Sequence, residues 1–172
     1  MTASMRILVA GIGNIFWGDD AFGVEVAHRL ARRDWPDGVR VVDFGIRGLD
    51  LAYALLDNYD AVIMIDATRQ GGTPGSIYVI EPEVGPVDAH DSERVLVETH
   101  AMVPEKALRL AAAMGAQFEY VRLVGCEPEK IGSADNMIMG LSGSVQKAVD
   151  RAAPVVEQLV ERLLNEEHNL VT

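Results

Sequence analysis

The chain has 172 residues, a length typical of one domain, and a hydrophobic content of 49%, which is enough for a full core. Its net charge of −11 argues against a nucleic acid or an anionic membrane as partner, because both would repel it. The single cysteine, Cys126, excludes an internal disulfide. With no signal-peptide pattern and no membrane-length apolar run, we expect a cytoplasmic monomer with one domain over residues 1–172 and a core over about 6–164.

The first predicted strand and helix enclose a glycine-rich turn. Residues 6–10 form a short apolar, β-branched run that is typical of a buried strand. Phe22, Val26 and Leu30 then recur at helical spacing, which predicts a helix over residues 21–33. The turn between them includes residues 11–23, GIGNIFWGDDAFG. In an open α/β sheet such turns lie at the carboxyl ends of strands, where ligands bind.

This turn does not fit a dinucleotide-binding fingerprint. Gly11 and Gly13 match its first two glycines, but Phe16 stands where the third must be. The adjacent Asp19 and Asp20 would also place negative charge near a pyrophosphate. A helix N-cap accounts for one aspartate, for which we favour Asp19, and leaves Asp20 without a structural role.

The remaining elements alternate between strands and helices, which predicts a doubly wound sheet. We expect further strands over residues 39–44, 61–66 and 120–124, and helices over 49–58, 104–114 and from Ser142 or Ser144 to about Leu164, with Pro154 kinking or splitting the last one. The connection over residues 67–75 is too short for a parallel crossover. We therefore expect a fifth strand over 76–81 to run antiparallel to the strand over 61–66, and residues 82–99 to be mostly loop.

Two acids and one imidazole occupy similar places in the chain. Asp20 follows the first strand, Asp66 ends the third, and His100 precedes the helix at Pro104. Neighbouring strands would place Asp20 and Asp66 across one crevice, where two carboxylates repel unless a proton or a cation lies between them. His100 would complete an oxygen–oxygen–nitrogen set suited to nickel or zinc. Strand-end acids that cap helices and a plain loop histidine are the structural alternatives.

The pattern G-x-G-N-x-x-x-x-D-D-x-x-G over residues 11–23 resembles the opening motif of the hydrogenase maturation endopeptidases, and the resemblance extends over about residues 6–164. It implies a three-layer α/β/α fold, phosphorylase/hydrolase-like, with a mixed, mostly parallel five-stranded sheet and one antiparallel strand. It also implies removal of the C-terminal extension from a nickel-loaded [NiFe]-hydrogenase large-subunit precursor. The nickel then belongs to the substrate, and no tightly bound cofactor of the protein's own is expected.

The resemblance also implies site residues. Asp20, Asp66 and His100 correspond to the residues that contact metal in this family, and Asp20 is our candidate for the general base. Asp43 and Gly45, in the segment DFGIRG over residues 43–48, fall in the family's Asp-Gly-Gly-Thr-x-Gly loop and are expected to contact substrate. A strand-end turn that requires glycine is the alternative reading of this loop.

Other hydrolase signatures are missing from the sequence. There is no H-E-x-x-H, and GLSGS at residues 140–144 fails G-x-S-x-G. Cys126 would need a nearby imidazole to act as a nucleophile. Two rival functions remain open: a non-catalytic nickel-recognising maturation chaperone that uses the same three residues, and a nucleotide-binding regulator, which only the two-glycine turn favours.

Overall fold

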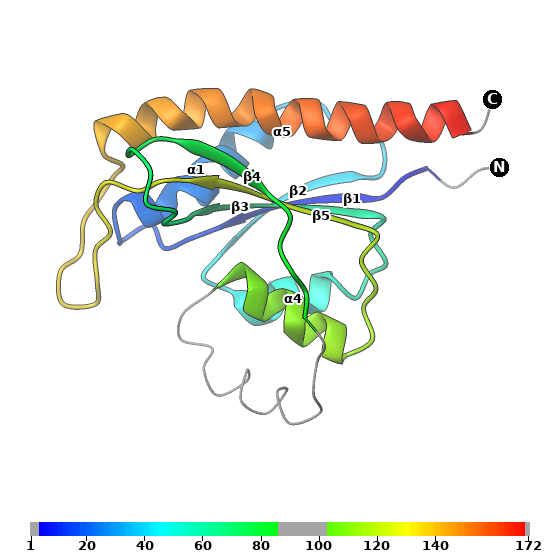
Figure 1. Ribbon diagram of the computed structural model, residues 1–172, viewed down its shortest axis with the longest axis horizontal. Helices are drawn as coiled ribbons and strands as arrows, with labels where there is room; N and C mark the ends of the chain where they lie inside the picture. Colours follow the sequence, from blue (N-terminus) through cyan, green and yellow to red (C-terminus); the bar gives the residue numbers. More distant parts are fainter. Residues whose placement is uncertain (1–3, 86–102, 171–172) are drawn as a thin grey trace.

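A five-stranded β-sheet forms the middle layer of the protein, described here by a computed structural model over residues 4–85 and 103–170, with Asn169 and Leu170 as backbone only. The strands are β1 (Ile7–Ile12), β2 (Val39–Gly45), β3 (Ala61–Ala67), β4 (Ile77–Ile80) and β5 (Tyr120–Cys126). Their order is β2-β1-β3-β5-β4; only β4 is antiparallel to its neighbour. The predicted mixed, mostly parallel sheet is confirmed (Figure 1).

The antiparallel strand β4 lies at one edge of the sheet. It runs opposite to β3, as its short connection predicts, but it pairs with β5. Both sides of β3 are taken, by β1 and β5, and all but the last of its residues are buried. Val79 of β4 is 50% exposed, which suits an edge strand. The predicted direction is therefore confirmed, with β5 as the neighbour.

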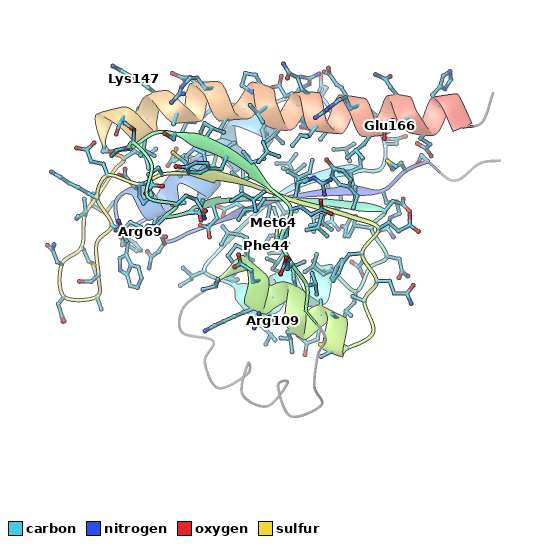
Figure 2. All side chains as sticks on the ribbon, viewed as in Figure 1. Phe44, Met64, Arg69, Arg109, Lys147 and Glu166 are labelled. Carbon is cyan, nitrogen blue, oxygen red and sulfur yellow. The ribbon has the colours of Figure 1, made fainter. Side chains whose placement is uncertain are left out.

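Helices cover both faces of the sheet. Helices α1 (Phe22–Leu30) and α5 (Gly143–Leu170) lie on one face, and α2 (Gly48–Ala54) and α4 (Pro104–Ala113) on the other (Figure 1). Ile7 of β1 belongs to the core shared with α1 and α5, whereas Leu8 belongs to the core shared with α2 and α4, because successive strand side chains point to opposite faces. Figure 2 labels Phe44 and Met64, whose side chains belong to the core between the sheet and helices α2 and α4.

Helix α5 is longer than its sequence predicts and is not split. It runs from Gly143 to Leu170 as one helix that includes Pro154, and it continues past Leu164. Of the two predicted effects of Pro154, the split is therefore wrong, and the predicted end is wrong as well. Pro154 is exposed, while Ala153 and Val156 beside it are buried in the core that α1 and α5 share with the sheet. Packing of this apolar stripe on the sheet offsets the cost of an interior proline, about 3 kcal/mol.

Helices α1 and α2 end earlier than predicted. After α1, the backbone N–H groups of Arg32 and Arg33 donate to carbonyls three residues back, which makes a tight turn instead of a further α-helical turn. After α2, Asn58 adopts a positive φ of 55°, which no helix can continue. Of the predicted loop over residues 82–99, the part from residue 86 lies outside the described residues. Within the described part of the chain, we find no helix with the length and apolarity needed to span a membrane.

Candidate functional site

Three glycines allow α1 to begin directly on the carboxyl ends of β1 and β3. A Cβ atom on Gly23 would lie 2.0 Å from the carbonyl oxygen of Ile65 and 2.3 Å from that of Ile12. A Cβ on Gly11 would lie 2.5 Å from the Cβ of Ala27, and one on Gly13 would also collide with backbone. Only glycine fits this close approach of helix to sheet. The short 3-10 turn η1 (Asp19–Ala21) is thereby held at the same edge as the end of β3.

Asp20 lies in this turn and is partly buried. Its Oδ2 accepts a hydrogen bond of 2.8 Å from the backbone N–H of Asn14. Burial raises the pKa of the Asp20 carboxyl, and the Asn14 hydrogen bond offsets part of that rise. Asp20 is thus held by the backbone of the glycine-rich turn, with a carboxyl group that is easier to protonate than usual.

Asp66 lies at the end of β3 and is only 8% exposed. Burial raises its pKa well above the ordinary value; the charge of Asp20 raises it further, and the backbone N–H of Ala67 lowers it in part. The charge of Glu105, in the first turn of α4, adds a smaller rise. The structure therefore brings Asp20 and Asp66 into one electrostatic environment, as the strand order predicts. Such a pair is stabilised by a proton or a cation between its members.

The third predicted ligand, His100, lies outside the described residues, so its role stays a prediction. Within residues 4–85 and 103–170, no group of three or more His, Cys, Asp or Glu side chains could hold a metal ion. In the described part of the chain, the acids that act on one another here are Asp20 and Asp66, with Glu105 as a third acid whose charge reaches Asp66. Sequence reasoning missed Glu105, although it is the residue after Pro104, the predicted start of the helix.

The prediction that Asp19 caps a helix is wrong. The residue before η1 is Gly18, and no side chain caps that turn. Asp19 is fully buried, and its carboxylate accepts four hydrogen bonds: from the backbone N–H of Glu129 and of Lys130, and from both the N–H and the hydroxyl of Ser142, at 2.7–2.9 Å. Asp19 therefore joins the glycine-rich turn to the loop that follows β5.

Asp43 and Gly45 lie at the end of β2, beside the same turn. Nε2 of His28 on α1 is 2.8 Å from Oδ2 of Asp43, an ion pair when the imidazole is protonated. Gly45 has a φ of 53°, in the left-handed region that favours glycine, and its carbonyl accepts a hydrogen bond of 3.0 Å from Gly13. The turn thus has a structural need for Gly45. The predicted contact of Asp43 and Gly45 with substrate stays a prediction.

A pocket of about 290 Å³ opens between the ends of β1 and β2. It is lined by the glycine-rich turn, by Val24 of α1 and by the segment after β2: Gly13, Asn14, Ile15, Phe16, Val24, Asp43, Phe44, Gly45, Ile46 and Arg47. Asn14 also donates its backbone N–H to Asp20. The pocket and the carboxylate pair are therefore connected through one residue.

Cys126 and Glu127, which follow each other at the end of β5, have structural roles. Cys126 is fully buried, and burial, with the nearby Asp19 charge, raises its pKa to about 11, so its thiol stays protonated at neutral pH. The Glu127 carboxylate accepts hydrogen bonds from the backbone N–H of Gln70 and from the hydroxyl of Tyr78, and the backbone bonds hold its pKa below the ordinary value. Glu127 thus fastens the loop between β3 and β4.

Solved structures of hydrogenase maturation peptidases share this fold. The hydrogenase 2 maturation peptidase from a Thaumarchaeota archaeon is 31% identical, with a TM-score of 0.67, over 91% of this chain and 98% of that one. HybD, a hydrogenase maturating endopeptidase from E. coli, is 28% identical, with a TM-score of 0.69, over 92% and 93% of the two chains. The fold is therefore that of the maturation endopeptidases.

Sequence comparison gives the same answer at the level of the family. The family model described as hydrogenase maturation protease matches residues 24–159, a range that includes Asp43 and Asp66 and begins after Asp20. A putative hydrogenase maturation protease from Methanocaldococcus jannaschii is 30% identical over 87% of this chain and 93% of its own length. HoxM, a hydrogenase expression/formation protein from Azotobacter vinelandii, is 34% identical over 76% of this chain. The match covers only 61% of the length of HoxM. This chain belongs to the hydrogenase maturation protease family.

Proposed function

We propose that this protein is an endopeptidase that removes the C-terminal extension from a nickel-loaded [NiFe]-hydrogenase large-subunit precursor. The observation that carries the proposal is the carboxylate pair of Asp20 and Asp66 at the carboxyl ends of β1 and β3, with the charge of Asp20 acting on Asp66. Buried acids of like charge at a strand-end edge are costly for the fold and therefore point to a function.

The proposed partner of the pair is the nickel that the precursor carries. Two carboxylates with raised pKa values gain most from a positive ion, because it removes both the repulsion and the uncompensated charge. In this proposal Asp20, Asp66 and His100 contact the nickel, which belongs to the substrate, and the protein keeps no tightly bound cofactor of its own. Contact with the nickel would restrict cleavage to precursors that already contain it.

Asp20 is the proposed general base for hydrolysis. It would take a proton from the attacking water as the oxygen adds to the scissile carbonyl carbon; when the C–N bond breaks, that proton passes to the leaving amine. A base is most effective when its pKa lies near the working pH, and burial shifts Asp20 in that direction. The partly exposed position of Asp20, compared with the buried Asp66, favours Asp20 for contact with water.

The test is a processing assay with purified protein and nickel-loaded or nickel-free precursor, read by intact mass. We expect a shortened large subunit from the loaded precursor only. The variants Asp20→Asn, Asp66→Asn and His100→Ala should each lose processing, whereas Asp37→Asn, at an exposed site, should not. Full processing by His100→Ala would remove that residue from the proposal. A stable complex without any cleavage would instead support a nickel-recognising chaperone.

Further expectations belong to this proposal. The enzyme should act as a monomer in the cytoplasm, without nucleic acid or a membrane as partner, in keeping with its net charge of −11. Calorimetric titration with nucleotides should give no binding heat, because the glycine-rich turn holds carboxylates where a phosphate site needs free N–H groups: Asp20 already takes the N–H of Asn14.

A further inference from the structure

The pocket between the ends of β1 and β2 has apolar walls that reach the surface. Val24 and Phe44 are buried at 1% and 5% exposure and form its interior. Ile15, Phe16 and Ile46 also line it, yet these side chains are 44%, 46% and 62% exposed. Three large apolar side chains that converge on one cavity while remaining in water are typical of a binding site.

Several polar groups around this pocket already have partners within the protein. Oδ1 of Asn14 accepts the backbone N–H of Phe16, and Asp43 faces His28. The guanidinium of Arg47 donates to the carbonyl oxygens of Asp43 and Phe44, and also lies 3.3 Å from Asp50. These internal bonds and the apolar lining favour an apolar group as the occupant, because a charged or amide group would have to compete with the bonds already made.

The size of the pocket limits what it can accept. At about 290 Å³ it falls at the lower end of the roughly 300–1,000 Å³ found for small-molecule sites. Gly13 and Asn14 line it, and Asn14 donates to the Asp20 carboxylate, so an occupant would sit close to Asp20. A group of this size and place fits one side chain of a polypeptide whose backbone passes the carboxylates.

We infer that this pocket, formed by Ile15, Phe16, Val24, Phe44 and Ile46, binds one large apolar side chain of the polypeptide substrate, close in sequence to the bond that is cut. The inference rests on the proposed endopeptidase function and adds a specificity subsite to it. The pocket recognises sequence, whereas the carboxylate pair recognises the metal. A loaded protein that lacks the apolar side chain is therefore cleaved less efficiently than one that carries it.

A kinetic comparison tests the subsite with the loaded precursor as substrate. Ile46→Asp places a charge at the pocket mouth on an exposed residue, so the fold should survive; we expect KM to rise about tenfold or more with kcat within twofold. The matched control is Val79→Asp, a similarly exposed apolar residue on the edge strand β4, which should change neither constant by more than twofold. Equal kinetics for the two variants would overturn the inference.

A substrate series identifies the side chain that enters the pocket. In the precursor, each large apolar residue near the cleavage site is replaced by alanine in turn, and wild-type protein and Ile46→Asp are compared on each. The inference predicts one position at which alanine costs the wild type about tenfold in kcat/KM but costs Ile46→Asp much less, since the contact is already lost. Independent effects at every position would contradict it.

A cross-linking arm keeps the inference separate from the proposed function. The photoreactive residue p-benzoylphenylalanine replaces Ile46, and the adduct with the precursor is mapped by mass spectrometry. An adduct within a few residues of the C-terminal cleavage region supports the subsite even where no cleavage occurs; an adduct elsewhere, or none, overturns it. If the wild type cleaves the precursor, but Ile46→Asp behaves like Val79→Asp and the cross-link does not form near the cleavage region, only the subsite is wrong. If cleavage fails while the adduct forms, only the proposed function is wrong.

Discussion

The charge of Asp20, in the turn η1 before α1, raises the pKa of Asp66, at the end of β3. Asp66 is the more buried of the two and bears the effect of this interaction, whereas the pKa of Asp20 is raised by its own burial. The fold thus keeps an acid where its ionised form is unfavourable, which is a common cost of a functional site. This relationship gives the first prediction.

Asp66→Asn should stabilise the protein at neutral pH while removing processing. A carboxyl group whose pKa is raised in the folded state contributes stability below its unfolded pKa of about 3.9, and loses that contribution as the pH rises through the folded value. The amide removes this loss. We expect the free energy of unfolding in urea to rise by about 0.5–2 kcal/mol at pH 7 relative to wild type, with a much smaller difference at pH 3. Asp37→Asn is the control, and an equal gain at both pH values would contradict the account.

Asp19→Ala should be among the most destabilising single substitutions at the site. It leaves four donors of Glu129, Lys130 and Ser142 without their acceptor in a fully buried position. Hydrogen bonds to a charged group are worth about 1.5–3 kcal/mol each, so a loss on the order of 3 kcal/mol or more is expected in urea unfolding. Ser142→Ala removes the hydroxyl alone and should cost about 1 kcal/mol. Similar losses for the two variants would be inconsistent with the role of Asp19.

Glu127→Gln should flatten the acid limb of the stability curve. Because hydrogen bonds hold the pKa of Glu127 below its ordinary value, its contribution is present above the unfolded pKa of about 4.3 and is lost as the pH falls through the folded value. The neutral amide has no such dependence. Urea unfolding between pH 2.5 and 6 should therefore show a smaller fall for Glu127→Gln than for wild type. Glu83→Gln, at an exposed site, should follow wild type throughout.

Gly23→Ala should separate α1 from the sheet. The new Cβ would lie 2.0 Å from the carbonyl oxygen of Ile65, and backbone atoms on both sides leave it no space. We expect a loss of about 1–3 kcal/mol or more in the free energy of unfolding, together with lost processing. Gly143→Ala is the matched control, since a Cβ there meets nothing within 4 Å, and alanine there should be neutral or stabilising by up to about 1 kcal/mol. A Gly23→Ala protein as stable as wild type would refute the close approach.

The sequence predicts that Asp20 and Asp66 lie close together, because their positions follow from two local patterns and one general rule. Each acid follows an apolar run that reads as a strand, and strand ends in a doubly wound sheet share an edge. Asp19 was misassigned for the opposite reason: its partners Glu129, Lys130 and Ser142 lie more than a hundred residues away, and nothing in the local pattern separates such an anchor from a helix cap.

Tertiary packing explains the other differences from prediction. Pro154 predicts a kinked or split helix when α5 is considered alone, but the buried stripe on both sides of it keeps the helix continuous. The length of the loop predicts the direction of β4 but not the strand that it pairs with. The strand beside β3 is β5, whose Val121, Leu123 and Val124 are all buried. The apolar pocket likewise joins residues of two segments, 13–16 and 43–47, with Val24 of α1.

The most direct measurement is the mass of the large-subunit precursor after incubation with wild-type protein and with the double variant Asp20→Asn/Asp66→Asn. The double variant keeps the fold, because each amide replaces a carboxyl group of the same shape. The account predicts a product shortened at its C-terminus with wild type and loaded precursor, and an unchanged mass with the double variant. Equal processing by the two proteins would contradict the claim that the carboxylate pair carries the activity.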